Sequence, residues 1–150
     1  MNPARLDAYC GLYCGACLIY QATRREDLAS AAAALGRPGD GLACDGCRSD
    51  RVTVACRACW YRDCPRGRGY SSCAECPEMP CDALKSLEMR RPHLVEIAGN
   101  LKQIRADGSA RWCETQAARW TCPACGEPAW WYGTTCAACG APVPVAYEKA

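Results

Sequence analysis

The sequence predicts a small α+β protein whose fold depends on bound metal ions. Sixteen of its 150 residues are cysteines, a share above one tenth that far exceeds ordinary usage. The chain has no phenylalanine, so its apolar core is modest and cross-links must replace part of the missing burial. Most cysteines come as C-x-x-C pairs, a spacing that lets two sulfurs bind one ion from a tight turn. We expect helices packed on metal-binding knuckles, followed by a C-terminal zinc-ribbon β-hairpin.

Metal ions are expected as the cross-links, in preference to disulfides. Disulfide-rich domains are typical of secreted proteins, which carry an apolar signal segment. The first seven residues, MNPARLD, are polar, and no stretch approaches the roughly 18 apolar residues of a membrane span. We therefore expect a cytoplasmic protein that does not enter a membrane.

The opening segment, CGLYCGAC at residues 10–17, reads as a glycine-rich loop that can turn backbone N–H groups toward its three sulfurs. Helical periodicity follows from Leu18 to Leu35, and its alanine-rich part spans residues 27–35. Gly36 is the expected C-cap of this helix, followed by Pro38.

A central cysteine-rich segment, residues 44–81, contains eight cysteines and few other residues that could form a core. These are Cys44, Cys47, Cys56, Cys59, Cys64, Cys73, Cys76 and Cys81. The spacing C-x2-C-x4-C occurs twice, beginning at Cys56 and at Cys73, which suggests two similar turns. The β-branched residues of the sequence RVTV at 51–54 predict a short strand.

Helices are expected again after Pro80. Asp82 is a plausible N-cap for a helix over residues 83–90, and an apolar stripe of period 3.6 predicts an amphipathic helix over residues 94–104. Ser109 can cap a further helix over residues 110–120. We divide the chain into a multi-metal domain with a helical brace, residues 1–108, and a short helix with a zinc ribbon, residues 109–150.

The C-terminal part repeats the pattern C-x-x-C-G, with ten residues between the two knuckles. Its cysteines are Cys122, Cys125, Cys136 and Cys139. Four thiolates around one ion form a closed tetrahedral site, the structural type of zinc site. The glycine after each knuckle can supply the positive φ that such turns need.

The cysteine motifs in residues 10–84 resemble a bacterial and archaeal family named only as domain of unknown function 3795. The matching pieces are CGLYCGAC at 10–17, CDGC at 44–47, the Cys56/Cys59 pair, Cys64, CAEC at 73–76 and Cys81. The resemblance implies metal binding and no particular activity. Residues 122–140 are similar to a zinc ribbon, a common motif that implies one zinc ion.

The eleven cysteines of the first half do not divide by four. One partition gives one ion Cys44, Cys47, Cys56 and Cys59 and a second ion Cys64, Cys73, Cys76 and Cys81; interleaved pairing fits the spacing equally well. The first partition leaves Cys10, Cys14 and Cys17 in need of a fourth ligand, for which His93 is a candidate. We expect three to four zinc ions, or alternatively one [4Fe–4S] cluster on Cys10, Cys14 and Cys17 plus a fourth ligand.

Surface residues suggest possible partners. Arg57, Arg62 and Arg66 lie in an arginine-rich stretch that could contact nucleic acid, and Trp130, Trp131 and Tyr132 could face another protein. No serine–histidine–aspartate set, phosphate loop or paired carboxylates indicate an enzyme. The expected function is a zinc-binding structural or adaptor protein; the alternatives are an iron–sulfur electron-transfer or sensor protein, and a nucleic-acid-binding zinc protein.

Overall fold

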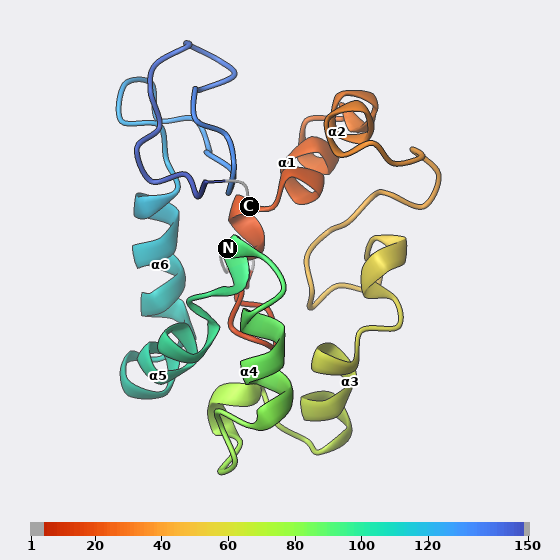
Figure 1. Cartoon of the computed structure of the whole chain (residues 1–150), viewed down its shortest axis with the longest axis vertical. Helices are drawn as coiled ribbons and strands as arrows, with labels where there is room; N and C mark the ends of the chain where they lie inside the picture. Colours follow the sequence, from red (N-terminus) through yellow and green to blue (C-terminus); the bar gives the residue numbers. More distant parts are fainter. Residues whose placement is uncertain (1–4, 149–150) are drawn as a thin grey trace.

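The computed structural model describes residues 5–148 and is mostly helical (Figure 1). Its α-helices are α1 (Leu18–Arg24), α2 (Leu28–Leu35), α3 (Trp60–Gly67), α4 (Asp82–Glu88), α5 (Ile97–Asp107) and α6 (Ser109–Arg119). Single 3-10 turns are η1 (Cys14–Ala16), η2 (Val54–Cys56), η3 (Cys73–Glu75) and η4 (Pro92–Leu94). None of the helices in the described part of the chain is long and apolar enough to cross a membrane.

The predicted α+β class, with its C-terminal β-hairpin, is wrong. Within residues 5–148, β pairing is limited to three isolated bridges, and no sheet forms. Two of these bridges lie in the C-terminal region, and in each one partner is a proline, Pro128 or Pro142. Because proline has no N–H to donate, a ladder cannot extend through these positions. The strand predicted at residues 51–54 is also absent, because Val54 already begins η2.

The helix predicted from Leu18 to Leu35 is divided into α1 and α2. The chain turns at Glu26, whose φ is +56°, and Asp27 then caps α2 by accepting a hydrogen bond from the Ser30 N–H. The expected C-cap at Gly36 is confirmed, since this residue is left-handed with φ +61°.

Later helices follow the sequence periodicity more closely. Those predicted over 83–90 and 110–120 correspond to α4 and α6, although each begins one residue earlier. The one predicted over 94–104 begins at Ile97, because residues 92–94 form η4. No sequence pattern predicted α3, an arginine-rich helix that contains Pro65.

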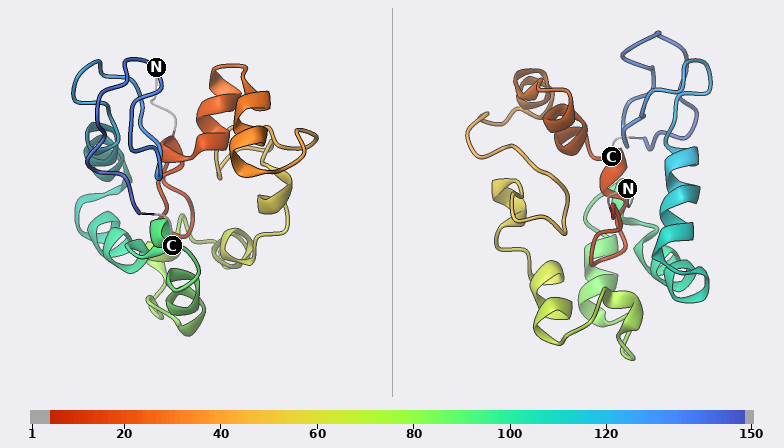
Figure 2. Two further views of the ribbon diagram at one scale, coloured as in Figure 1. Left: turned by 45° about the horizontal axis from the view of Figure 1, so that its top comes forward. Right: turned by 180° about the vertical axis from the view of Figure 1, so that it is seen from behind.

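The N-terminal segment runs through the centre of the molecule. Figures 1 and 2 show α5, α6 and the C-terminal loops on one side of it, and α1, α2 and the chain through residue 67 on the other. The larger core surrounds α5 and α6, where Ile97, Leu101 and Trp112 are fully buried. A smaller core joins α1 and α2 to Leu42, which precedes the central segment, and to Val52 within it.

Asp7 lies at the junction of these two sides, with none of its surface exposed. Its carboxylate accepts hydrogen bonds from Arg5 at 2.8 Å and Arg48 at 2.9 Å. The Arg48 side chain also donates to the Asp7 carbonyl at 2.7 Å, and the Cys113 thiol on α6 lies 3.7 Å from the carboxylate. One buried carboxylate therefore connects the N-terminal segment, the central segment and α6.

We expect Asp7→Asn to destabilise the protein by about 3–5 kcal/mol, because it leaves the guanidinium of Arg48 buried without a counter-charge. Urea unfolding of protein with its metals bound would measure the loss. Asp45→Asn is the matched control, since the Asp45–Arg51 pair is exposed and should contribute little. Equal effects of the two substitutions would contradict the central role of Asp7.

Candidate metal centres

Two short loops of the same backbone shape build the C-terminal site. In the first, the Cys122 N–H donates to the Glu127 carbonyl at 2.8 Å, and the Gly126 N–H donates to the Cys122 carbonyl at 2.9 Å. The second loop repeats both bonds at its equivalent positions. Gly126 and Gly140 take φ values of +80° and +76°, as expected for the residue after each knuckle.

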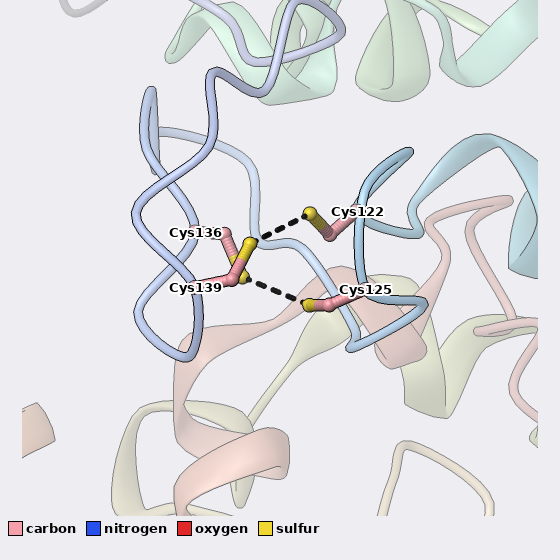
Figure 3. A group of neighbouring side chains, drawn as sticks. All are labelled: Cys122, Cys125, Cys136 and Cys139. Carbon is pink, nitrogen blue, oxygen red and sulfur yellow. Dashed lines mark hydrogen bonds between the residues drawn. The ribbon is translucent and has the colours of Figure 1, made fainter.

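The two loops bring four sulfurs together (Figure 3). All four Sγ atoms lie within 4.8 Å of one another. The Cys122–Cys139 and Cys125–Cys136 sulfur pairs are each 3.6 Å apart. A tetrahedral ion bound at about 2.3 Å by four sulfurs places them about 3.8 Å apart. This four-cysteine site could therefore hold a single metal ion.

Backbone N–H groups prepare two of these thiols for ionisation. Hydrogen bonds from the N–H groups of Cys125 and Ala124 lower the pKa of Cys122 to about 6. Those from Cys139 and Ala138 lower the pKa of Cys136 in the same way. Because the thiolate is the form that binds metal, these N–H groups favour metal binding near neutral pH.

The four-cysteine site is attached to the N-terminal half through residues 129–132. Gln21 on α1 donates to the carbonyls of Gly15 and Ala129 at 2.9 and 2.8 Å, and the Trp131 N–H donates to the Ala16 carbonyl at 3.2 Å. These bonds fix the C-terminal loops against η1, which contains Cys14.

The three aromatic residues predicted to face a partner are half-buried. Trp131 stacks on His93 with ring centroids 4.1 Å apart, and the Tyr132 hydroxyl lies 2.7 Å from His93 Nδ1. Trp130 packs edge-on against Tyr132. His93, which the sequence offered as a candidate metal ligand, contacts Trp131 and Tyr132 instead. Partner binding by the three aromatic residues stays a prediction.

In the N-terminal half, Cys47 lies beside Cys10 and Cys14. The Cys47 N–H donates to the Cys14 sulfur, and the Tyr9 N–H donates to the Cys47 sulfur. Burial, and then the neighbouring Cys47, raises the pKa of both Cys10 and Cys14. The opening loop is therefore paired with the second cysteine of the CDGC sequence.

Cys17 belongs to a different neighbourhood, with Cys44 and Cys56. Its sulfur accepts N–H bonds from the first turn of α1, although burial still raises its pKa, and the thiol of Cys44 adds to that rise. Burial and then Cys44 raise the pKa of Cys56 to about 12. Cys59, Cys17 and Cys47 add to the rise at Cys56, so its neighbours include members of both partitions, and the ligand roles of these residues stay predictions.

Cys59 is a further neighbour of Cys10, Cys47 and Cys56. The last four cysteines of this half, Cys64, Cys73, Cys76 and Cys81, line one cavity of about 330 Å³. This is the second group of the simple partition. Within residues 5–148, only the C-terminal four-cysteine site brings three or more candidate ligand atoms within 4.8 Å of one another.

Two arginines, Arg62 and Arg105, bind backbone carbonyls and so have structural roles. Of the two, only Arg62 was a candidate for nucleic-acid contact from the sequence. Arg62 donates to the carbonyls of Cys47 and Ser49, each at 2.9 Å, so its guanidinium holds the central segment. Arg105 on α5 donates to the carbonyls of Ala74 and Cys76 at 2.7 and 2.9 Å and holds η3. No sequence pattern marked Arg105. Arg57 and Arg66 are exposed, and nucleic-acid binding stays a prediction.

A family model described as "Protein of unknown function (DUF3795)" matches residues 6–86, which is more than half of the chain. The chain belongs to this family. The match includes all eleven cysteines from Cys10 to Cys81 and ends before the C-terminal four-cysteine site. No curated protein sequence and no solved structure matches the chain.

His93 should make the stability of the fold depend on pH. Burial, and then nearby Arg91, lowers the pKa of His93 to about 4. The unfolded chain therefore binds a proton at higher pH than the folded chain does, and stability falls as the pH drops from about 6.5 toward 4. When the pH is lowered from about 7 to about 5.5, the melting temperature of His93→Gln should fall less than that of wild type at equal metal content. An identical loss in both proteins would contradict this linkage.

Proposed function

We propose that this member of the family is a zinc-binding structural protein that acts as an adaptor for other proteins. The observation that carries the proposal is the C-terminal site, with four sulfurs within 4.8 Å of one another. A closed set of four thiolates leaves no open position for substrate, which is typical of structural zinc rather than catalytic zinc. Because iron can occupy a similar four-sulfur site, metal analysis is part of the test.

Zinc would supply the cross-link that the C-terminal loops otherwise lack. Beyond the two isolated bridges, the two loops have no β-ladder to hold them together, and both Cys125 and Cys139 are exposed. An ion that joins Cys122 and Cys125 to Cys136 and Cys139 would fix the two loops relative to each other, so its binding free energy becomes folding free energy. All sixteen cysteines are free thiols, which supports a reducing compartment such as the cytoplasm.

The adaptor role is supported by apolar side chains at the surface. Trp60 at the start of α3 and Val54 in η2 are 55% and 58% exposed. Trp130, Trp131 and Tyr132 keep part of their surface accessible next to the four-cysteine site. Aromatic residues are enriched where proteins bind one another, so a protein is the partner that these surfaces fit best.

The double substitution Cys122→Ala/Cys139→Ala should remove one zinc ion per chain, because it takes away two of the four ligands. Elemental analysis of protein purified without oxygen would measure the change, and faster proteolysis of residues 121–142 should accompany it. Cys113→Ala is the matched control, since Cys113 lies beside Asp7 and outside the four-cysteine site. If the double variant kept its full zinc content, zinc binding at this site would be disproved.

A further inference from the structure

The cavity lined by Cys64, Cys73, Cys76 and Cys81 differs in kind from the C-terminal site. Its volume is about 330 Å³, far above the roughly 10–15 Å³ that a single water molecule requires. Pro65, Met79 and Leu84 contribute apolar walls, and Trp60 lies at its edge. The cavity is therefore large enough for a group of several atoms.

Three separate backbone elements bring the four thiols to this cavity. Cys64 lies within α3, Cys73 begins η3, Cys76 is the C-cap of η3, and Cys81 is the N-cap of α4. The Cys73 N–H donates to the Tyr9 carbonyl at 2.8 Å, while Arg105 holds the carbonyl of Cys76. These bonds fix the η3 cysteines independently of whatever occupies the cavity.

We propose that Cys64, Cys73, Cys76 and Cys81 ligate a [4Fe–4S] cluster in this cavity. When four thiolates share one ion their sulfurs meet, as they do at 3.6 Å in the C-terminal site. In a four-iron cluster each thiolate binds a different iron, so the sulfurs surround a volume instead. Four thiols around a partly apolar cavity fit the second arrangement. This proposal goes beyond the zinc site and does not depend on it.

Arg68 would tune the cluster. Its Nη1 lies 3.6 Å from the Cys76 sulfur and 2.9 Å from a Glu78 carboxylate oxygen, so the guanidinium is held where it can donate to a ligand sulfur. N–H groups that donate to cluster sulfurs stabilise the reduced, more negative cluster and raise its reduction potential. The cluster would accept one electron from a low-potential one-electron donor, with no bond formed or broken, and return it to an acceptor.

The test uses the full chain, purified without oxygen after reconstitution with ferrous iron and sulfide. We expect about four irons and four sulfides per chain at this site, with broad visible absorption that dithionite bleaches. Cys73→Ala and Cys81→Ala should each lose this iron and absorption, while Cys122→Ala/Cys139→Ala should retain both. Colourless protein in which Cys73→Ala releases zinc would show a single ion and overturn the proposal. Iron that survives both substitutions but is lost in Cys10→Ala would place the cluster elsewhere and overturn it too.

A second measurement keeps all four thiols in place and so avoids variants that fail to fold. Arg68→Gln should bind the same iron as wild type but shift the midpoint potential of the cluster to more negative values. Arg66→Gln is the matched control, because Arg66 is exposed and its nearest carboxylate is Asp63 at 3.9 Å. An unchanged potential in Arg68→Gln would contradict a cluster ligated by Cys76. A wild-type protein that holds this iron but no zinc at the C-terminal site would count against the zinc-binding structural role and leave the cluster proposal standing.

Discussion

The fold depends on the buried carboxylate of Asp7, whose negative charge needs a positive group beside it. Asp7 has no exposed surface, and an unpaired charge in such a position would be strongly destabilising. Arg48 supplies the counter-charge and also packs over the ring of Tyr9 at 4.3 Å. Tyr9 in turn bonds to the Cys47 sulfur through its N–H and to the Cys73 N–H through its carbonyl. The position of the N-terminal segment, which contains Asp7 and Tyr9, therefore determines where Cys47 and Cys73 lie relative to the opening loop.

Burial and metal binding shift the pKa of the same thiols in opposite directions. Desolvation raises the pKa of Cys10, Cys14 and Cys73, the last to about 12, so without a cation these thiols stay protonated near neutral pH. A bound cation would reverse this by stabilising the thiolates, and proton release would accompany binding. In the C-terminal site, N–H bonds to Cys122 already favour the thiolate before any ion arrives. The pKa of Cys125 and of Cys139 in the same site is raised, because each shares a proton with a neighbouring thiol, so an ion there also has protons to displace.

What could be predicted from the sequence was mainly local. The stop at Gly36 and the periodic helices α4, α5 and α6 follow from neighbouring residues, and the C-x-x-C-G spacing correctly brought four sulfurs together. The predicted β-hairpin does not form because Pro128 and Pro142 interrupt the ladder, and the cysteine spacing carries no information about these prolines. The α3 helix was missed because Pro65 lies inside it, and proline is expected to break a helix rather than to lie within one. The pairing of Cys47 with the opening loop depends on the long-range contact between Asp7 and Arg48, which no spacing encodes.

The C-terminal site and the family-matched region are mechanically connected, although the match ends at residue 86. Gln21 holds both Gly15, in the opening loop, and Ala129, which follows the first C-x-x-C-G knuckle. Trp131 adds a bond to Ala16, and its stacking on His93 ties the same loop to η4. An ion in the four-cysteine site would therefore restrain η1 and the thiols on either side of it. In this arrangement an ion bound by the four C-terminal cysteines would add rigidity to the opening loop of the family-matched region.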